Sequence, residues 1–107
     1  MIYLASPYSD RDEAVMEQRF DAVCRKAGEL MNAGHVVYSP IAHCHPIAVR
    51  VGLPRDWEFW RKFDREMLQG ATSFLVLKLP GWEQSSGIAG ERKIAESMGL
   101  VVGYIES

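Results

Sequence analysis

The residues most capable of chemistry lie in residues 85–91, which follow an apolar run typical of a buried strand. Serines, glycines and other small residues in this order are typical of a strand end, a loop and a helix start. Free backbone N–H groups and the helix dipole attract anions at such a helix start. Ser85, Ser86 and Gly87 are therefore candidates for binding an anionic group. Glu91 brings a carboxylate into the first turns of the same helix.

Glu91 falls on an unexpected face of this predicted helix. On a helical wheel it shares the side of Ile88, Ala95 and Met98, which is the side expected to face the core. A carboxylate without a partner is expensive to bury. Glu91 therefore needs a partner or a chemical role.

A second inward carboxylate is predicted in the preceding helix. Asp64 shares one face with aromatic and aliphatic residues, namely Trp57, Trp60, Met67 and Leu68. Two inward carboxylates on different helices can carry out acid–base or nucleophilic chemistry. The alternative is that each is half-exposed at its helix end and pairs with an arginine. Trp57 and Trp60 either offer faces for stacking on a planar base or pack in the core.

The run His43-Cys44-His45 contains residue types that bind metals. A metal site needs three or four convergent ligands, and no further cluster of these types follows in the sequence. We therefore predict no metal and no cofactor. A histidine of this run is expected to lie near a substrate or to make a structural hydrogen bond.

Apolar runs and amphipathic stretches define the elements that must position these residues. Strands are predicted at residues 2–5, 35–38, 72–77 and 100–105. Helices are predicted from a cap at Ser9 or Asp10 to about residue 32, from a cap at Asp56 to about Gln69, and over residues 88–97. Residues 41–55 contain two prolines and a glycine and are predicted to form a loop, with or without one helical turn.

Strands that alternate with helices predict an α/β fold in one domain, residues 1–107. We expect a small doubly wound, mainly parallel four-stranded sheet of the flavodoxin-like or Rossmann-like kind, with right-handed crossovers. Ligands of such sheets bind at the carboxyl ends of the strands, near the switch in strand order. The loops expected there include Ser6 and Tyr8, which are candidate substrate contacts. Tyr8 either contacts substrate or covers the end of the sheet.

Four segments together resemble the nucleoside 2-deoxyribosyltransferase-like superfamily, which includes deoxyribosyltransferases and deoxynucleoside 5′-monophosphate N-glycosidases. They are residues 2–9, 33–40, 57–64 and 85–91, so the resemblance extends over nearly the whole chain. It is strongest to a branch of small bacterial and phage proteins of undefined function. The first loop, Ser6-Pro7-Tyr8, departs from the glycine-rich loop of the superfamily.

The resemblance implies a role for four residues. Glu91 matches a nucleophilic glutamate that attacks the anomeric carbon, and Tyr3 matches a tyrosine that orients this glutamate. Asp64 matches an aspartate that contacts the base or assists its protonation. Ser85 matches a serine that binds the 5′-phosphate in the monophosphate hydrolases.

These implied roles predict hydrolysis of the N-glycosidic bond of a (deoxy)nucleoside 5′-monophosphate through a glycosyl–Glu91 intermediate. One alternative is a nucleoside deoxyribosyltransferase that passes the sugar to another base. Another is a non-catalytic nucleotide-binding module that acts as a sensor. A third is a structural or partner-binding domain without a small ligand. Ser85, Ser86, Gly87, Ser6, Tyr8 and Trp60 are the predicted substrate contacts. Relatives assemble as dimers or larger, so a homo-oligomer is expected.

The composition excludes several other classes of protein. The net charge of −2 and the absence of a lysine or arginine cluster argue against a nucleic-acid polymer as partner. Five apolar residues at the start are too few for a signal peptide or a membrane span. Two cysteines without CxxC spacing are expected to be reduced thiols. We therefore expect a cytoplasmic protein that binds a small-molecule nucleotide or nucleoside.

Overall fold

Four parallel strands form one sheet in the computed structural model, which describes residues 1–107. In chain order they are β1 (Ile2–Ala5), β2 (Val37–Tyr38), β3 (Ser73–Leu77) and β4 (Val101–Ile105). Their spatial order is β2-β1-β3-β4, and every neighbouring pair is parallel. This confirms the predicted α/β fold of the flavodoxin-like or Rossmann-like kind. The order reverses between β1 and β3, which places the ligand-binding crevice of this fold at the ends of these two strands.

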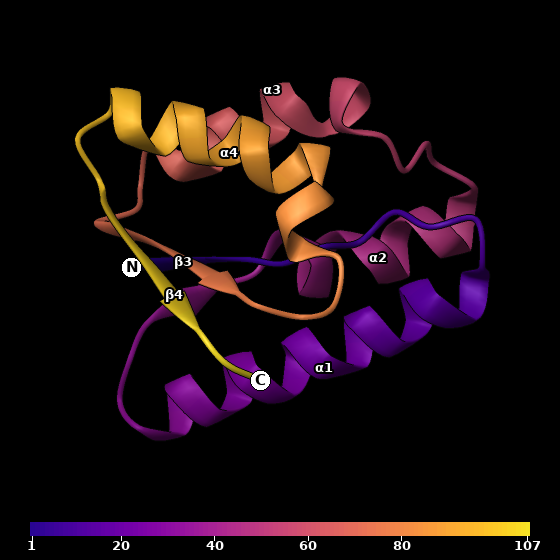
Figure 1. Cartoon of the computed structure of the whole chain (residues 1–107), viewed down its shortest axis with the longest axis horizontal. Coiled ribbons are helices and arrows are strands. Elements are labelled where there is room, and N and C mark those ends of the chain that lie inside the picture. The colour runs from indigo at the N-terminus through magenta and orange to yellow at the C-terminus, as the bar shows by residue number, and fades with distance from the viewer.

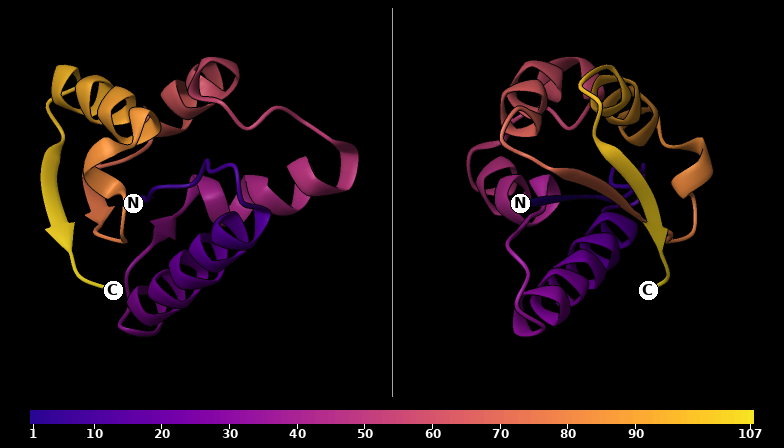
Figure 2. Two further views of the ribbon diagram at one scale, coloured as in Figure 1. Left: turned by 45° about the vertical axis from the view of Figure 1, so that its right-hand side comes forward. Right: turned by 90° about the vertical axis from the view of Figure 1, so that its left-hand side faces the viewer.

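Four α-helices cover the sheet (Figure 1). They are α1 (Glu13–Asn32), α2 (Pro40–Val51), α3 (Trp57–Leu68) and α4 (Ser86–Ser97), and a short 3₁₀ turn, η1 (Trp82–Gln84), precedes α4. The two views of Figure 2 place α1 on one side of the sheet and α3 with α4 on the other. No helix has both the length and the apolar character that crossing a membrane would require.

The alternation of side chains along β1 divides the core into two parts. Tyr3 and Ala5 belong to a cluster with buried residues of α3 and α4, whereas Leu4 belongs to a cluster with α1. Ile41 and Ala42 of α2 pack against the second cluster. The helices α1 and α2 therefore share one side of the molecule, and Tyr3 points toward the opposite side, where α3 and α4 lie.

Residues 41–55 are not the loop that the sequence predicts, because most of them form α2. Ser39 begins this helix by accepting a hydrogen bond from the Ala42 N–H at 3.1 Å, and Pro40 occupies its first turn. Gly52, with φ 73°, ends it in the left-handed conformation that favours glycine. Of the three loop signals in residues 41–55, Gly52 ends the helix, Pro46 lies inside it and only Pro54 lies between helices.

The start of α1 also differs from the prediction. Asp12 is the N-cap and accepts a hydrogen bond from the Ala14 N–H at 2.9 Å. Asp10, two residues before Asp12, accepts from the Asp12 N–H instead. Ser9 donates to the Arg55 carbonyl instead of capping the helix. Several polar residues in a row each offer a cap, and local sequence does not decide among them.

The contact between α3 and α4 depends on a glycine. A Cβ placed on Gly90 would lie 2.4 Å from the indole ring of Trp57. Ala is the better helix former by about 1 kcal/mol, but this overlap forces the ring or the helix to move. We expect Gly90→Ala to lower the free energy of unfolding by about 1–3 kcal/mol, measured by urea denaturation.

Gly28→Ala in α1 is the matched control for this substitution. A Cβ at Gly28 meets no atom within 4 Å, so the gain in helix propensity should remain and stability should rise by up to about 1 kcal/mol. Equal effects of the two substitutions would contradict a specific contact between Gly90 and Trp57.

Candidate active site

A cavity of about 320 Å³ opens at the carboxyl ends of β1 and β3, where the strand order reverses. Its walls combine the loop after β1, the start of α2, the segment between α2 and α3, and the turn before α4. Eight of the nine predicted site residues line it: Ser6, Tyr8, Trp60, Asp64, Ser85, Ser86, Gly87 and Glu91. The ninth, Tyr3, does not line the cavity but donates a hydrogen bond to Glu91, which does.

Glu91 and Tyr3 form a buried hydrogen bond behind the wall of the cavity. The Tyr3 hydroxyl donates to Glu91 Oε2 at 2.5 Å. The Tyr3 ring is fully buried between Phe74 and Tyr38, with ring centroids 5.7 and 5.6 Å away. Only 4% of Glu91 is exposed. This packing leaves the Tyr3 ring little freedom, and the hydrogen bond therefore fixes the orientation of the Glu91 carboxyl.

Asp64 lies next to this pair on α3. It is 6% exposed, and its Oδ1 is a buried atom without a hydrogen-bond partner in the protein. An unpartnered buried carboxylate oxygen in a cavity wall is expensive unless a ligand satisfies it. The alternative of half-exposed carboxylates paired with arginines is therefore wrong for both Asp64 and Glu91.

The two carboxyls change each other's protonation. Burial raises the pKa of Asp64 to about 6, although the nearby polar groups of Glu91 and Tyr3 oppose the change. Burial and then the charge of Asp64 raise the pKa of Glu91 well above its usual value. Burial, with the charges of Glu91 and Asp64, likewise raises the pKa of Tyr3, so its phenol stays neutral. Because burial and mutual repulsion disfavour two negative charges, the carboxyl pair retains a proton at a higher pH than two free carboxyls would.

This proton makes stability depend on pH. Both carboxyls have a raised pKa in the folded protein, so the stability they contribute is complete below about pH 4, where the unfolded chain is also protonated. It is lost as the pH rises past the value of about 6 for Asp64. Asp64 alone accounts for a decrease on the order of 3 kcal/mol.

We expect the free energy of unfolding to fall more steeply between about pH 4 and pH 8 in the unaltered protein than in the double variant Asp64→Asn/Glu91→Gln. Urea denaturation at a series of pH values measures both slopes. The difference between the two proteins cancels the contribution of surface carboxylates. Parallel curves would show that the pair ionises as it does in the unfolded chain.

The turn before α4 provides the predicted anion site. Ser85 is the N-cap of α4 and accepts from the Ile88 N–H at 3.2 Å, while Ser86 and Gly87 form the first turn beside the cavity. Since α4 begins at Ser86, two residues before the predicted start, its positive dipole end faces the cavity. Arg55 also lines the cavity and adds positive charge.

Arg19 is a site residue that the sequence interpretation missed. From α1 it donates to the carbonyl oxygens of Tyr8, Ser9 and Pro80 at 3.2, 3.0 and 3.2 Å, and it lines the cavity. It therefore ties the loop after β1 to the loop after β3 across the switch in strand order. Its position, three residues after Met16 on the inward edge of the helix, was the available signal.

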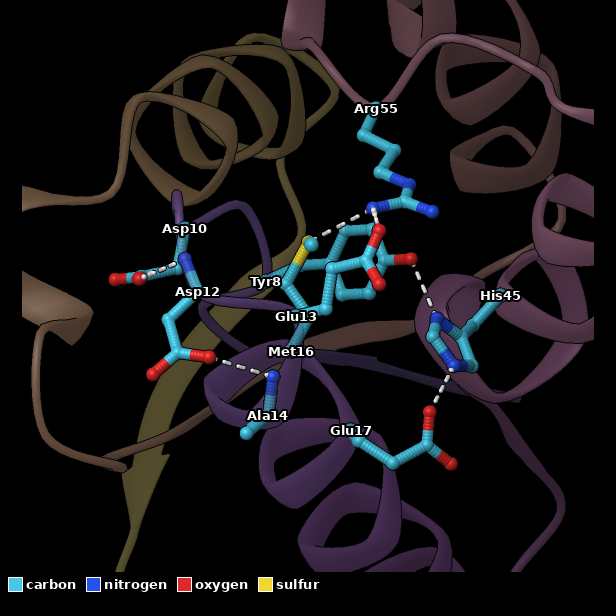
Figure 3. A network of polar contacts seen from close by, with 9 residues as sticks. All are labelled: Tyr8, Asp10, Asp12, Glu13, Ala14, Met16, Glu17, His45 and Arg55. Carbon is cyan, nitrogen blue, oxygen red and sulfur yellow. Dashed lines mark hydrogen bonds and ion pairs between the residues drawn. The ribbon is translucent and has the colours of Figure 1, made fainter.

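The residues of the His43-Cys44-His45 run point to different surroundings. His45 is buried and bonds to Tyr8 and Glu17, as Figure 3 shows. Burial raises the pKa of the Cys44 thiol to about 11, so this residue lines the cavity as a neutral group. His43 is exposed. The structure brings no three His, Cys, Asp or Glu side chains into an arrangement that could hold a metal ion.

The two tryptophans of α3 both line the cavity. Trp57 also packs against the core cluster under α4, whereas the indole N–H of Trp60 donates to the Pro54 carbonyl at 2.8 Å. Trp60 is thus held by a backbone contact with part of its surface toward the cavity, and Trp57 has a larger share in the core.

Comparison with known sequences gives the chain a family but no activity. No curated protein matches the sequence. A family model matches residues 1–106, which is nearly the whole chain. The protein therefore belongs to the family described as Domain of unknown function (DUF1937).

Proposed function

We propose that this protein hydrolyses the N-glycosidic bond of a (deoxy)nucleoside 5′-monophosphate through a covalent glycosyl–Glu91 intermediate. The observation that carries the proposal is the buried 2.5 Å hydrogen bond from Tyr3 to Glu91, beside Asp64, whose Oδ1 has no partner, in the wall of a cavity. A carboxylate held in one orientation next to a second carboxyl group is the arrangement that cleavage of a glycosidic bond uses. The resemblance to the nucleoside 2-deoxyribosyltransferase-like superfamily supports the same roles.

The first step breaks the bond between the sugar and the base. A Glu91 carboxylate oxygen attacks the anomeric carbon while the C–N bond breaks, and its electron pair leaves with the base. Asp64 supplies a proton to the base, which makes it a better leaving group. The positive charge that develops on the sugar favours ionised Glu91, so the proton shared by the two carboxyls moves to Asp64 as the reaction proceeds.

The second step releases the sugar. Water attacks the anomeric carbon of the glycosyl–Glu91 ester, the bond to the Glu91 oxygen breaks, and the carboxylate is restored. The products are a free base and a sugar 5-phosphate. The site excludes most water from Glu91, which is 4% exposed, and this favours covalent capture over random hydrolysis of the sugar cation.

The phosphate is assigned to the first turn of α4. Ser85, Ser86 and Gly87 present hydroxyl and backbone N–H groups at the positive end of this helix. Arg55 lies on the same cavity and can complement the phosphate charge. The base is assigned to the side of the cavity formed by α3, where Trp60 offers a ring face and Asp64 a proton.

The test is a panel of nucleoside and deoxynucleoside 5′-monophosphates with each of the common bases, analysed by chromatography. Release of free base with sugar 5-phosphate supports hydrolysis. If base appears only when an acceptor base is added, the protein is a transferase. Tight binding of a nucleotide without any turnover would indicate a sensor module and would overturn the catalytic proposal.

A further inference from the structure

A chain of three side chains, Tyr8, His45 and Glu17, leads from the cavity to the protein surface (Figure 3). The Tyr8 hydroxyl lies 2.5 Å from His45 Nδ1, and His45 Nε2 lies 2.9 Å from Glu17 Oε2. Tyr8 and His45 line the cavity, and His45 is 6% exposed. The Glu17 side chain is 66% exposed. A phenol, an imidazole and a carboxylate thus connect the cavity with solvent.

The Glu17 carboxylate determines which atom is the donor in each hydrogen bond of this chain. Glu17 can only accept, so His45 carries its proton on Nε2 and donates it to Glu17. In the neutral ring Nδ1 is then an acceptor, and the Tyr8 hydroxyl donates to it. The Tyr8 oxygen consequently keeps its lone pairs free to accept a proton, and the residue lines the cavity. A residue whose proton is already directed to an oriented base is prepared to take another, as in other triads of this type.

The two walls of the cavity provide different groups. Asp64 and Glu91 come from α3 and α4, on one side of the sheet. Tyr8 and His45 come from the loop after β1 and from α2, which packs with α1 on the other side. In a double displacement the water attacks the face of the sugar opposite the bond to the enzyme nucleophile. The base leaves from that same face, so both Asp64 and Tyr8, which line one cavity, can be reached by this water. Tyr8 has the hydrogen-bonded route to solvent, through His45 and the exposed Glu17, that carries the water's proton away.

We infer that Tyr8, backed by His45 and Glu17, is the general base that activates the water in the second step. This inference rests on the proposed function. The water gives a proton to the Tyr8 oxygen as its electron pair forms the new bond to the anomeric carbon. The Tyr8 proton passes to His45 Nδ1, and the bond between the sugar and Glu91 breaks with its electron pair on the carboxylate. The imidazolium, paired with Glu17, then releases its proton to solvent, and Asp64 takes up a proton from solvent once the products have left, which restores the carboxyl pair for the next substrate.

Tyr8→Phe tests this role because it keeps the ring and removes the hydroxyl. Rapid-quench kinetics should show a burst of free base close to one equivalent per active site, followed by turnover about 10²–10⁴-fold slower than in the unaltered protein. Intact-protein mass spectrometry should find the sugar phosphate attached during turnover. Azide attacks without losing a proton, so it should restore turnover and yield a glycosyl azide.

Two further variants separate a relay from a structural role. Glu17→Gln keeps an acceptor for His45 but removes its charge, and should slow sugar release about 10-fold. Glu29→Gln, another exposed glutamate of α1, which pairs with Lys26, should leave all rates unchanged. Nitrogen NMR of the unaltered protein should show the His45 proton on Nε2.

The outcomes that overturn the inference differ from those that overturn the proposed function. Full turnover in Tyr8→Phe, loss of its burst, or failure of azide to restore turnover overturns the role of Tyr8 alone. If the unaltered protein releases no base from any nucleotide, the proposed function fails, and the assignment of a general base fails with it.

Discussion

Glu91→Gln is expected to reduce base release by about 10⁴-fold or more, because removal of a catalytic nucleophile has effects of this size. The glutamine side chain has the same shape, and its amide oxygen can still accept the hydrogen bond that Tyr3 donates to Oε2 at 2.5 Å. The amide oxygen is a far weaker nucleophile than a carboxylate and carries no charge to stabilise an oxocarbenium ion. The walls of the cavity that contact phosphate and base are unchanged, so affinity should remain.

Single-turnover chromatography measures the rate, and calorimetric titration of the inactive variant with the intact nucleotide measures its affinity. Glu96→Gln, an exposed glutamate of the same helix, is the matched control and should retain full activity. The peptide that carries the sugar in quenched unaltered enzyme should contain Glu91. A Glu91→Gln variant that retains turnover within about tenfold would show that no glycosyl–Glu91 ester forms.

Asp64→Asn is expected to have an effect that depends on the leaving base. For an ordinary base, loss of the proton donor should slow the first step by about 10²–10⁴-fold. For an N7-methylated purine, which already carries a positive charge and leaves without protonation, the loss should be about tenfold or less. The substitution keeps the shape of the side chain and removes a carboxyl group whose Oδ1 has no partner, so the fold should be retained.

The measurement is the rate of base release by Asp64→Asn from the ordinary and from the N7-methylated nucleotide, each relative to the unaltered protein. Glu91→Gln serves as its reference, because loss of the nucleophile should slow both substrates by similar factors. If Asp64→Asn slows the methylated and the ordinary nucleotide equally, Asp64 positions the substrate and does not donate a proton. Circular dichroism spectra of the variants should match that of the unaltered protein.

The sequence was sufficient for the sheet and for the two helices that carry the carboxyls. Continuous apolar runs predict strands that are covered on both faces, and the alternation of strands with helices predicts the parallel order that the structure shows. Helical periodicity placed Glu91 and Asp64 on inward faces, where they are 4% and 6% exposed. Period and composition are local properties, so a single sequence contains them.

Prediction was weakest where a residue has two structural uses. Proline and glycine mark loops but also start and end helices, and this is why α2 was predicted as a loop. His45 lies on that helix, so its orientation toward Tyr8 could not be derived from the sequence. Arg19 was overlooked for a related reason, because an arginine at the edge of an amphipathic stripe normally faces solvent.

The sequence by itself determined the fold class, the inward faces of the carboxyl-bearing helices and the small-residue turn at the start of α4. No local pattern links Tyr3 to Glu91, 88 residues away; the family resemblance implied the pairing, and the tertiary structure shows the hydrogen bond. Only the tertiary structure decided that Tyr8, His45 and Glu17 form one chain across three elements. The physical reason is that a propensity acts within a few residues along the chain. A hydrogen bond between distant elements depends on crossover geometry and helix packing, which are set only when the sheet and its helices assemble.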